Sequence, residues 1–187
     1  MRSYKCLSKS EYSFEQYKLV TIRDEDKYLI LQWRNEQIIN LRQKKTLSRE
    51  QQEKYFATVV LDLFVQEKPQ QLLFSFLENG LFVGYGGFVH IDWGSKNAEV
   101  SFLIETKFAL DEKKWAYTFS IYIQILKYIA KAELGFVKLH TFGYETEPYI
   151  FKFKVLLDLN FVEEARLKKH IMIENKFHDV LIHSYFL

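Results

Sequence analysis

The stretch from residue 84 to residue 135 constrains the fold of this chain more than any other part of it. Gly84 to Trp93 is rich in aromatic and β-branched residues, which is typical of a strand. Ala98 to Glu105 alternates between two faces, as a second strand would. A long helix is predicted from about Trp115 to Leu134, and Gly135 ends it. The N-terminus of such a helix presents backbone N–H groups that attract phosphate, so we expect a phosphate-bearing cofactor at this junction.

The remaining elements predict one mixed sheet with helices on both faces. Asp24 is expected to cap the first helix, Ser48 and Gln51 form a capping-box pattern, and Asn79-Gly80 is typical of a hairpin turn. Further strands are expected at 18–23, 71–77, 136–142, 166–173 and 180–186, and helices at 24–38, 48–66 and 148–159. The predicted order is β-α-α-β-β-β-α-β-α-β-β. We expect residues 1–17 to be an N-terminal extension packed on the surface and residues 18–187 to form a single domain.

Charge and cysteine content exclude several functional classes. The 187 residues include 26 Lys and Arg against 24 Asp and Glu, and a formal charge of +2 gives no case for nucleic-acid binding. Cys6 is the single cysteine, so the chain has no internal disulfide and no cysteine metal site. The histidines have no metal-ligand spacing, and we expect no metal. The N-terminus lacks the apolar run that is typical of a signal peptide, and no apolar run reaches 18 residues. We therefore expect a soluble cytoplasmic protein, monomer or homodimer, that does not bind membranes.

Several short motifs resemble one family. Trp33-Arg34-Asn35 lies on the first predicted helix, and Leu159-Asn160-Phe161 is followed by Glu163. Asn175-Lys176 followed by Asp179 is similar to a closing hairpin, and the element order agrees along residues 18–187. In these features the chain resembles the GNAT N-acetyltransferases, and most of all those acting on nucleotide-linked amino sugars in bacterial surface polysaccharide pathways.

The resemblance implies an α/β (α+β) fold with a mixed, mostly antiparallel central sheet. Two parallel strands, Ala98 to Ile104 and Phe136 to Thr141, should be neighbours that splay apart near Glu105. Acetyl-CoA would be the co-substrate and would lie at this splay. The family's phosphate loop has Gln or Arg, two residues, Gly, one residue, then Gly or Ala. Here Lys113 takes the first place and both glycines are missing. The implied cofactor-binding residues are Phe102, Leu103, Ile104, Lys113, Lys114, Trp115, Ala116, Tyr117, Thr118 and Phe119.

Two side chains are candidates for moving a proton. Acetyl transfer requires a neutral amine, so a base must accept its proton. Glu99, on the strand beside the expected cofactor, is the candidate base, and its alternative is a solvated edge glutamate or a partner of Lys or Arg. His90 could relay protons, or it could be a satisfied polar group at the rim of the sheet. We expect His90 and Asp92 to share the face of Phe88.

Two further side chains could bind the acceptor. Asp92 could hold a sugar hydroxyl, with the same rim alternative as His90. Arg34 could bind a nucleotide phosphate through its two-pronged guanidinium. Its alternative is an ion pair with Glu36 or Asp24.

One departure from the family pattern bears on mechanism. Many members carry a tyrosine five residues before the phenylalanine at position 161, as the acid that protonates the CoA thiolate; here that position is Leu156. The expected function is acetyl-CoA-dependent N-acetylation of a small amine, with a nucleotide-linked amino sugar as the acceptor. The alternatives are an N-terminal acetyltransferase of the ribosomal-protein type and a non-catalytic acyl-CoA-binding or scaffold protein.

Overall fold

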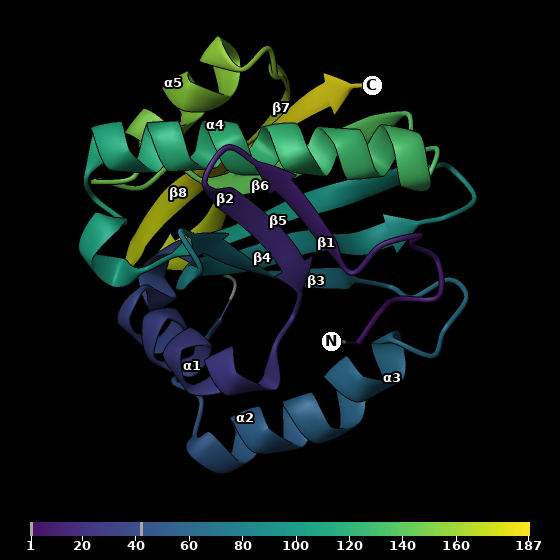
Figure 1. Ribbon diagram of the computed structural model, residues 1–187. Helices are drawn as coiled ribbons and strands as arrows, with labels where there is room; N and C mark the ends of the chain where they lie inside the picture. The colour runs from purple at the N-terminus through teal and green to yellow at the C-terminus, as the bar shows by residue number, and fades with distance from the viewer. Residues whose placement is uncertain (1, 42) are drawn as a thin grey trace.

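An eight-stranded sheet runs through the computed structural model, which describes residues 2–41 and 43–187 (Figure 1). Its strand order is β1-β2-β3-β4-β5-β6-β8-β7, and the neighbours are antiparallel except for β5 and β6. The strands are β1 Glu11–Phe14, β2 Tyr17–Thr21, β3 Leu72–Glu78, β4 Leu81–Asp92, β5 Asn97–Ile104, β6 Lys138–Tyr144, β7 Val162–Ile173 and β8 Lys176–Phe186. The mixed, mostly antiparallel sheet predicted from the sequence is therefore confirmed.

The helices lie in two groups on opposite sides of the sheet (Figure 1). The first group is α1 Lys27–Glu36, α2 Arg49–Tyr55 and α3 Leu61–Leu63, and the second is α4 Glu112–Tyr128 and α5 Phe151–Asp158. Short 3-10 turns occur at Asp24–Asp26, Ile38–Asn40 and Thr106–Phe108, and π turns at Phe56–Val60 and Ile129–Glu133. The sheet thus has one face toward α1 and one toward α4.

The parallel strands β5 and β6 are neighbours, as predicted, but they separate early. Their residue pairs run from Asn97–Lys138 to Glu99–His140. Divergence was expected near Glu105, whereas the pairing stops six residues sooner. β6 is paired with β8 along its whole length, from Lys138–Phe186 to Tyr144–Val180, and so it follows β8 away from β5. The result is a wedge-shaped gap that opens at Glu99.

The backbone of β5 directs hydrogen-bonding groups into this gap. The Glu105 N–H donates to the Val83 carbonyl oxygen at 2.9 Å, toward β4. Successive residues of a strand direct their backbone groups to opposite edges, and the β4–β5 register is continuous here. Phe102 lies beyond the last residue pair of β5 and β6, and its N–H and C=O groups therefore point away from β4, toward the gap.

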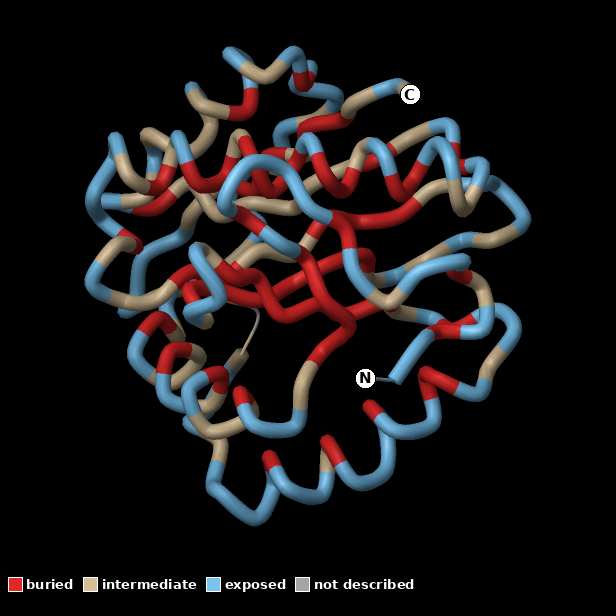
Figure 2. The backbone as a smooth tube through the Cα atoms, in the orientation of Figure 1, coloured by how far each residue is buried: buried red, intermediate tan, exposed pale blue. Residues whose placement is uncertain are grey.

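Aromatic packing joins the sheet to α4. Phe102 contacts the rings of Trp115, Phe119 and Tyr122, with centroids 4.5 to 5.9 Å apart. Figure 2 shows that the central strands and the inner side of α4 are buried. The Tyr122 hydroxyl donates to the Ser101 carbonyl oxygen at 2.6 Å. This packing fixes the position of α4 against the strand that borders the gap.

Several local signals are confirmed. Ser48 and Gln51 form both hydrogen bonds of a capping box. Asn79 and Gly80 have positive φ angles, as the predicted hairpin turn requires. Asn160 and Gly135 have φ of 63° and 62°, as expected for the residues that end α5 and the long helix.

Other local predictions are wrong in detail. Asp24 does not cap α1, because Asp26 occupies that position and its carboxylate bonds Arg23 instead. The long helix begins at Glu112 rather than near Trp115, because the Asp111 side chain caps it. Pro148 lies in a turn after a cis peptide bond, and α5 begins only at Phe151.

The first 17 residues contribute to the sheet and the core. They include the edge strand β1, which pairs with β2. Tyr4 is 1% exposed, and its hydroxyl donates to the Leu73 carbonyl oxygen at 2.8 Å. Tyr12 and Leu7 are also buried. This segment was expected to pack on the surface, and instead Tyr4 fills space beside β3 and Tyr12 contacts Tyr128 of α4.

Candidate active site

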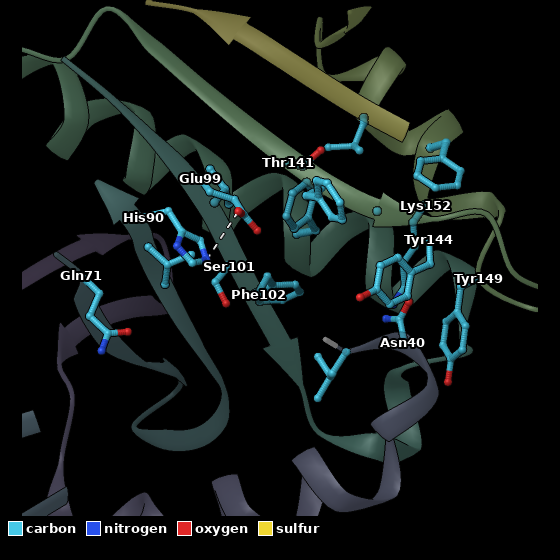
Figure 3. A pocket seen from close by; sticks show the side chains of 18 of the residues that line it. Asn40, Gln71, His90, Glu99, Ser101, Phe102, Thr141, Tyr144, Tyr149 and Lys152 are labelled. Carbon is cyan, nitrogen blue, oxygen red and sulfur yellow. Dashed lines mark ion pairs between the residues drawn. The ribbon is translucent and has the colours of Figure 1, made fainter. Parts of the chain in front are cut away.

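A cleft of about 740 Å³ occupies the gap between β5 and β6 (Figure 3). Its walls come from β5, β6, the first half of α4, the inner side of α5, and the segments around residues 40–41 and 70–71. His90 and Glu99 lie toward one end of the cleft, and Tyr144, Tyr149 and Lys152 lie toward the other (Figure 3). A long ligand could therefore contact both groups at once.

Glu99 lies where the parallel pairing of β5 and β6 stops. It is 7% exposed and lines the cleft, so it is not a solvated edge residue. Its Oε2 lies 3.9 Å from Nε2 of His90 (Figure 3). His140, opposite Glu99 on β6, has a pKa lowered by burial, against the opposing effect of the nearby Glu99 carboxylate. The end of the pairing thus brings together a carboxylate and two imidazoles.

A bulge in β4 determines where His90 points. The β4–β5 register shifts between Val89 and Asp92, and His90 has a φ of 49°. The predicted alternation therefore fails: Phe88 is fully buried, whereas the His90 side chain is 66% exposed and borders the cleft. Asp92 is the last residue of β4, beyond the bulge, and it is not among the described residues that line the cleft. Its Oδ1 accepts a hydrogen bond from the Ser95 N–H at 2.8 Å, and this bond lowers the pKa of Asp92.

Arg34 of α1 lines the cleft, and it makes neither of the ion pairs expected as alternatives. Its Nη1 donates to the Tyr85 hydroxyl at 2.7 Å, and its Nε donates to Gln43 at 3.0 Å. Glu36 accepts hydrogen bonds from Gln32 and Thr106 instead, and Asp24 pairs with Lys27. Both of these partners are neutral, so they hold the guanidinium in place without balancing its positive charge.

The predicted cofactor residues differ in where the structure places them. Phe102, Trp115 and Phe119 line the cleft. Leu103, Ile104 and Thr118 are buried, Lys113 and Tyr117 are exposed, and Ala116 is half-buried. Lys114 is ion-paired with Glu78 at 2.8 Å.

The N-terminus of α4 is more acidic than a phosphate site would suggest. The Asp111 carboxylate accepts a hydrogen bond from the Lys114 N–H at 2.9 Å, and the next residue is Glu112. Lys113, in the same turn of α4, is exposed and is the positively charged residue nearest in sequence to Asp111 and Glu112. A bound diphosphate would meet both signs of charge here.

The side of α5 that faces the cleft was missed by sequence reasoning apart from Leu156. Lys152, one turn before Leu156, also lines the cleft. Its Nζ lies 5.1 Å from the centre of the Trp115 ring and 4.4 Å from that of Tyr149. Burial lowers the pKa of Lys152 to about 7. The signal was present in the sequence, because residues four apart share one face of a helix.

Within residues 2–41 and 43–187, no cluster of three or more His, Cys, Asp or Glu could hold a metal ion. In the same residues, no helix is both long and apolar enough to cross a membrane.

Comparisons with known proteins agree with this geometry. The family model described as "Acetyltransferase (GNAT) domain" matches residues 19–182. No curated protein matches the chain. A solved spermidine N-acetyltransferase from Vibrio cholerae, in complex with CoA and spermine, is similar with a TM-score of 0.77 and 18% identity, over 92% of this chain and 96% of that one. An N-acetyltransferase from Staphylococcus aureus Mu50 is similar with a TM-score of 0.66 and 20% identity, over 91% and 98%.

Proposed function

Because the chain belongs to the GNAT acetyltransferase family, we propose that it acetylates the amino group of a small acceptor that also carries an anionic group. The protein is an acetyl-CoA-dependent N-acetyltransferase. The specific acceptor that we propose is an amino sugar linked to a nucleotide. The observation that carries the proposal is the cleft at the end of the β5–β6 pairing, with Glu99 at its start and Arg34 in its wall.

The charge of the cleft supports an acceptor with a negative group. Arg34 and Lys152 bring basic groups to the cleft, and Glu99 is the one carboxylate among the described residues that line it. A polyamine such as the spermine bound by the Vibrio cholerae enzyme carries several positive charges and would need more carboxylates than this. A nucleotide diphosphate would be attracted by Arg34, whose planar group binds phosphate oxygens in pairs.

The proposed mechanism is direct attack of the amine on the thioester. Glu99 accepts a proton from the amine, through water where the distance requires it, because an ammonium ion has no lone pair for attack. The Phe102 N–H and C=O groups that point into the gap orient the donor, and the N–H can polarise the thioester carbonyl. The nitrogen–carbon bond forms, the carbon–sulfur bond breaks, and the thiolate of CoA leaves.

A binding experiment tests the use of CoA. CoA should raise the melting temperature, because a ligand at 100 times its Kd stabilises the native state by about 2.7 kcal/mol. Lys113→Glu should reduce this rise, because it adds negative charge beside the diphosphate. Lys131→Glu, an exposed lysine beyond the other end of α4, is the matched control and should leave the rise unchanged. A well-folded protein with no shift in millimolar CoA would contradict the proposal.

An acceptor panel tests the substrate class. Thiol release from acetyl-CoA is followed with UDP-glucosamine, glucosamine, spermidine and a short peptide with a free N-terminus. We expect UDP-glucosamine to exceed glucosamine in kcat/KM, and Arg34→Met to remove that difference while glucosamine turnover stays the same. Preference for spermidine or for the peptide would contradict the nucleotide-linked acceptor, and the peptide would indicate a protein N-terminal acetyltransferase.

A further inference from the structure

Lys152 and Leu156 share one face of α5. They are four residues apart, and both line the cleft. Leu156 is 5% exposed and has no ionisable group. Among the described residues, Lys152 is therefore the only lysine of α5 that lines the cleft. It lies one helical turn from Leu156.

The surroundings of Lys152 are aromatic. The Trp115 ring lies on the α4 side and the Tyr149 ring precedes α5, with Nζ 5.1 Å and 4.4 Å from their centres. Tyr144 of β6 lies at the same end of the cleft as Tyr149 and Lys152 (Figure 3). Burial in this setting lowers the pKa of Lys152 to about 7. The amine is thus divided between its protonated and neutral forms near neutral pH.

The proposed reaction requires a proton for the thiolate of CoA. Cleavage of the carbon–sulfur bond produces a thiolate, and an alkyl thiol has a pKa of about 8.5. A positioned acid that protonates the thiolate as it leaves prevents the reverse attack on the amide.

We propose that Lys152 is the proton donor to the departing thiolate of CoA. In this step an N–H bond of the Lys152 ammonium breaks and an S–H bond forms, so that neutral lysine and free CoA thiol result. Lys152 then regains a proton from solvent before the next turnover. The inference rests on the proposed acetyl transfer and adds its general acid.

Acid strength favours Lys152 over the neighbouring groups. An ammonium of pKa about 7 gives its proton to a thiolate of pKa about 8.5 with an equilibrium constant of about 30. An ordinary lysine, with a pKa of about 10.4, would do so with a constant of about 0.01. Burial raises the pKa of Tyr149 above its ordinary value, so this phenol is the weaker acid.

The charged and titratable groups that share the cleft with Lys152 come from β4, β5, β6 and α1 and from the turn before α5. Tyr149 and Tyr144 lie beside it, and Glu99 and His90 lie toward the other end (Figure 3). Arg34 of α1 lines the same cleft. Because other titratable groups share the cleft, the test must isolate the contribution of Lys152 by substitution.

Two substitutions separate proton donation from charge. Lys152→Arg keeps the positive charge but holds its proton too tightly to act as an acid, and Lys152→Met removes both. With acetyl-CoA and the most active acceptor of the panel above, we expect each variant to lose about 10²-fold in kcat. The KM for acetyl-CoA should change less than about threefold in Lys152→Arg. Lys154→Arg, an exposed lysine on the same helix, is the matched control and should keep full activity.

The pH profile gives a second readout. Wild-type kcat should fall above the pKa of Lys152, because the neutral amine cannot donate, and this descending limb should be absent from Lys152→Met. Acetyl-pantetheine, which lacks the diphosphate, should show the same 10²-fold loss on substitution. A loss confined to the KM for acetyl-CoA, absent with acetyl-pantetheine and restored by Lys152→Arg, would overturn the inference and make Lys152 a phosphate ligand.

A stability measurement tests the lowered pKa of Lys152 with no acceptor present. The unfolded lysine stays protonated to about pH 10.4, whereas folded Lys152 releases its proton near 7. The unfolded state then binds more protons between these values, so wild-type stability should rise with pH relative to Lys152→Met. A difference that does not vary with pH would overturn the inference. If the wild type is active and the Lys152 variants are unaffected, only the role of Lys152 is overturned. If the wild type transfers no acetyl group, the proposed function is overturned as well.

Discussion

Glu99 is the residue whose substitution tests the chemistry most directly. Glu99→Gln keeps the shape of the side chain but cannot accept a proton, so kcat below the pKa of the acceptor amine should fall by about 10²–10⁴-fold. The loss should shrink as pH rises, because more of the free amine is then present and needs no base. Steady-state kinetics from pH 6 to pH 10 measure this.

Glu105→Gln is the control for Glu99→Gln. Glu105 follows the same strand, and its side chain is 26% exposed and paired with Lys107 at 2.8 Å. It lies outside the cleft wall, so its substitution should leave kcat unchanged. A Glu99→Gln protein that keeps full activity at neutral pH would end the proposed role of Glu99 and move attention to His90.

The residues of the cleft could be predicted only in part. Glu99 and Arg34 line it as their places on the strand and on the first helix suggest. Asp92 does not, because the bulge at His90 shifts the alternation, and no residue type between Val89 and Asp92 signals a positive φ. Lys152 was missed although its spacing from Leu156 places both on one face of α5, because the sequence alone does not show that this face borders the cleft.

At the scale of elements, close contact between β3 and β4 depends on glycine. Gly87 has a φ of 144°, and a Cβ atom there would lie 1.9 Å from the Leu72 carbonyl oxygen. Gly87→Ala should therefore destabilise the protein by about 3 kcal/mol or more, through strain and overpacking. Gly94→Ala is the control: its Cβ would lie 3.4 Å from Asp92, and the change should stay within about 0.5 kcal/mol. Urea unfolding of both variants measures this, and equal midpoints would contradict it.

The elements themselves were largely predictable, because their signals are local. The Ser48 capping box and the Asn79-Gly80 turn depend on neighbours in the chain, and both are confirmed. The point where β5 and β6 separate was not predictable. It follows from the pairing of β6 with β8, which lies more than thirty residues further along the chain. β1 was missed for the same reason, because it is recognised as a strand only through its pairing with β2.

At the scale of the whole molecule, one network joins the sheet to the start of α4. Lys114 Nζ and the Tyr17 hydroxyl both donate to the Glu78 carboxylate, at 2.8 Å and 2.6 Å. Burial by itself raises the pKa of Glu78, but these bonds outweigh it, and the pKa lies below its ordinary value. The stabilisation is therefore present above the unfolded pKa of about 4.3 and is lost as pH falls through the lower folded value.

Glu78→Gln tests this network. The stability difference between the wild type and this variant should be constant from pH 7 to about pH 5 and should shrink below about pH 4. Glu11→Gln removes the exposed pair with Lys18 and should change stability by less than about 1 kcal/mol. Thermal unfolding at several pH values measures both. A Glu78→Gln difference that persists at pH 2.5 would contradict the assignment.

The short β5–β6 pairing also gives the sheet an unequal resistance to force. β4 and β5 are joined from Gly84–Ile104 to Asp92–Asn97, and β6 and β8 are joined along all of β6. Between them, β5 and β6 share only the residue pairs from Asn97–Lys138 to Glu99–His140. Tension applied across the strands would therefore rupture the sheet here first, into a β1–β5 half and a β6–β8–β7 half. A donor molecule bound along β5 and β6 would bear part of that load, so occupancy of the cleft would strengthen the protein mechanically where it is weakest.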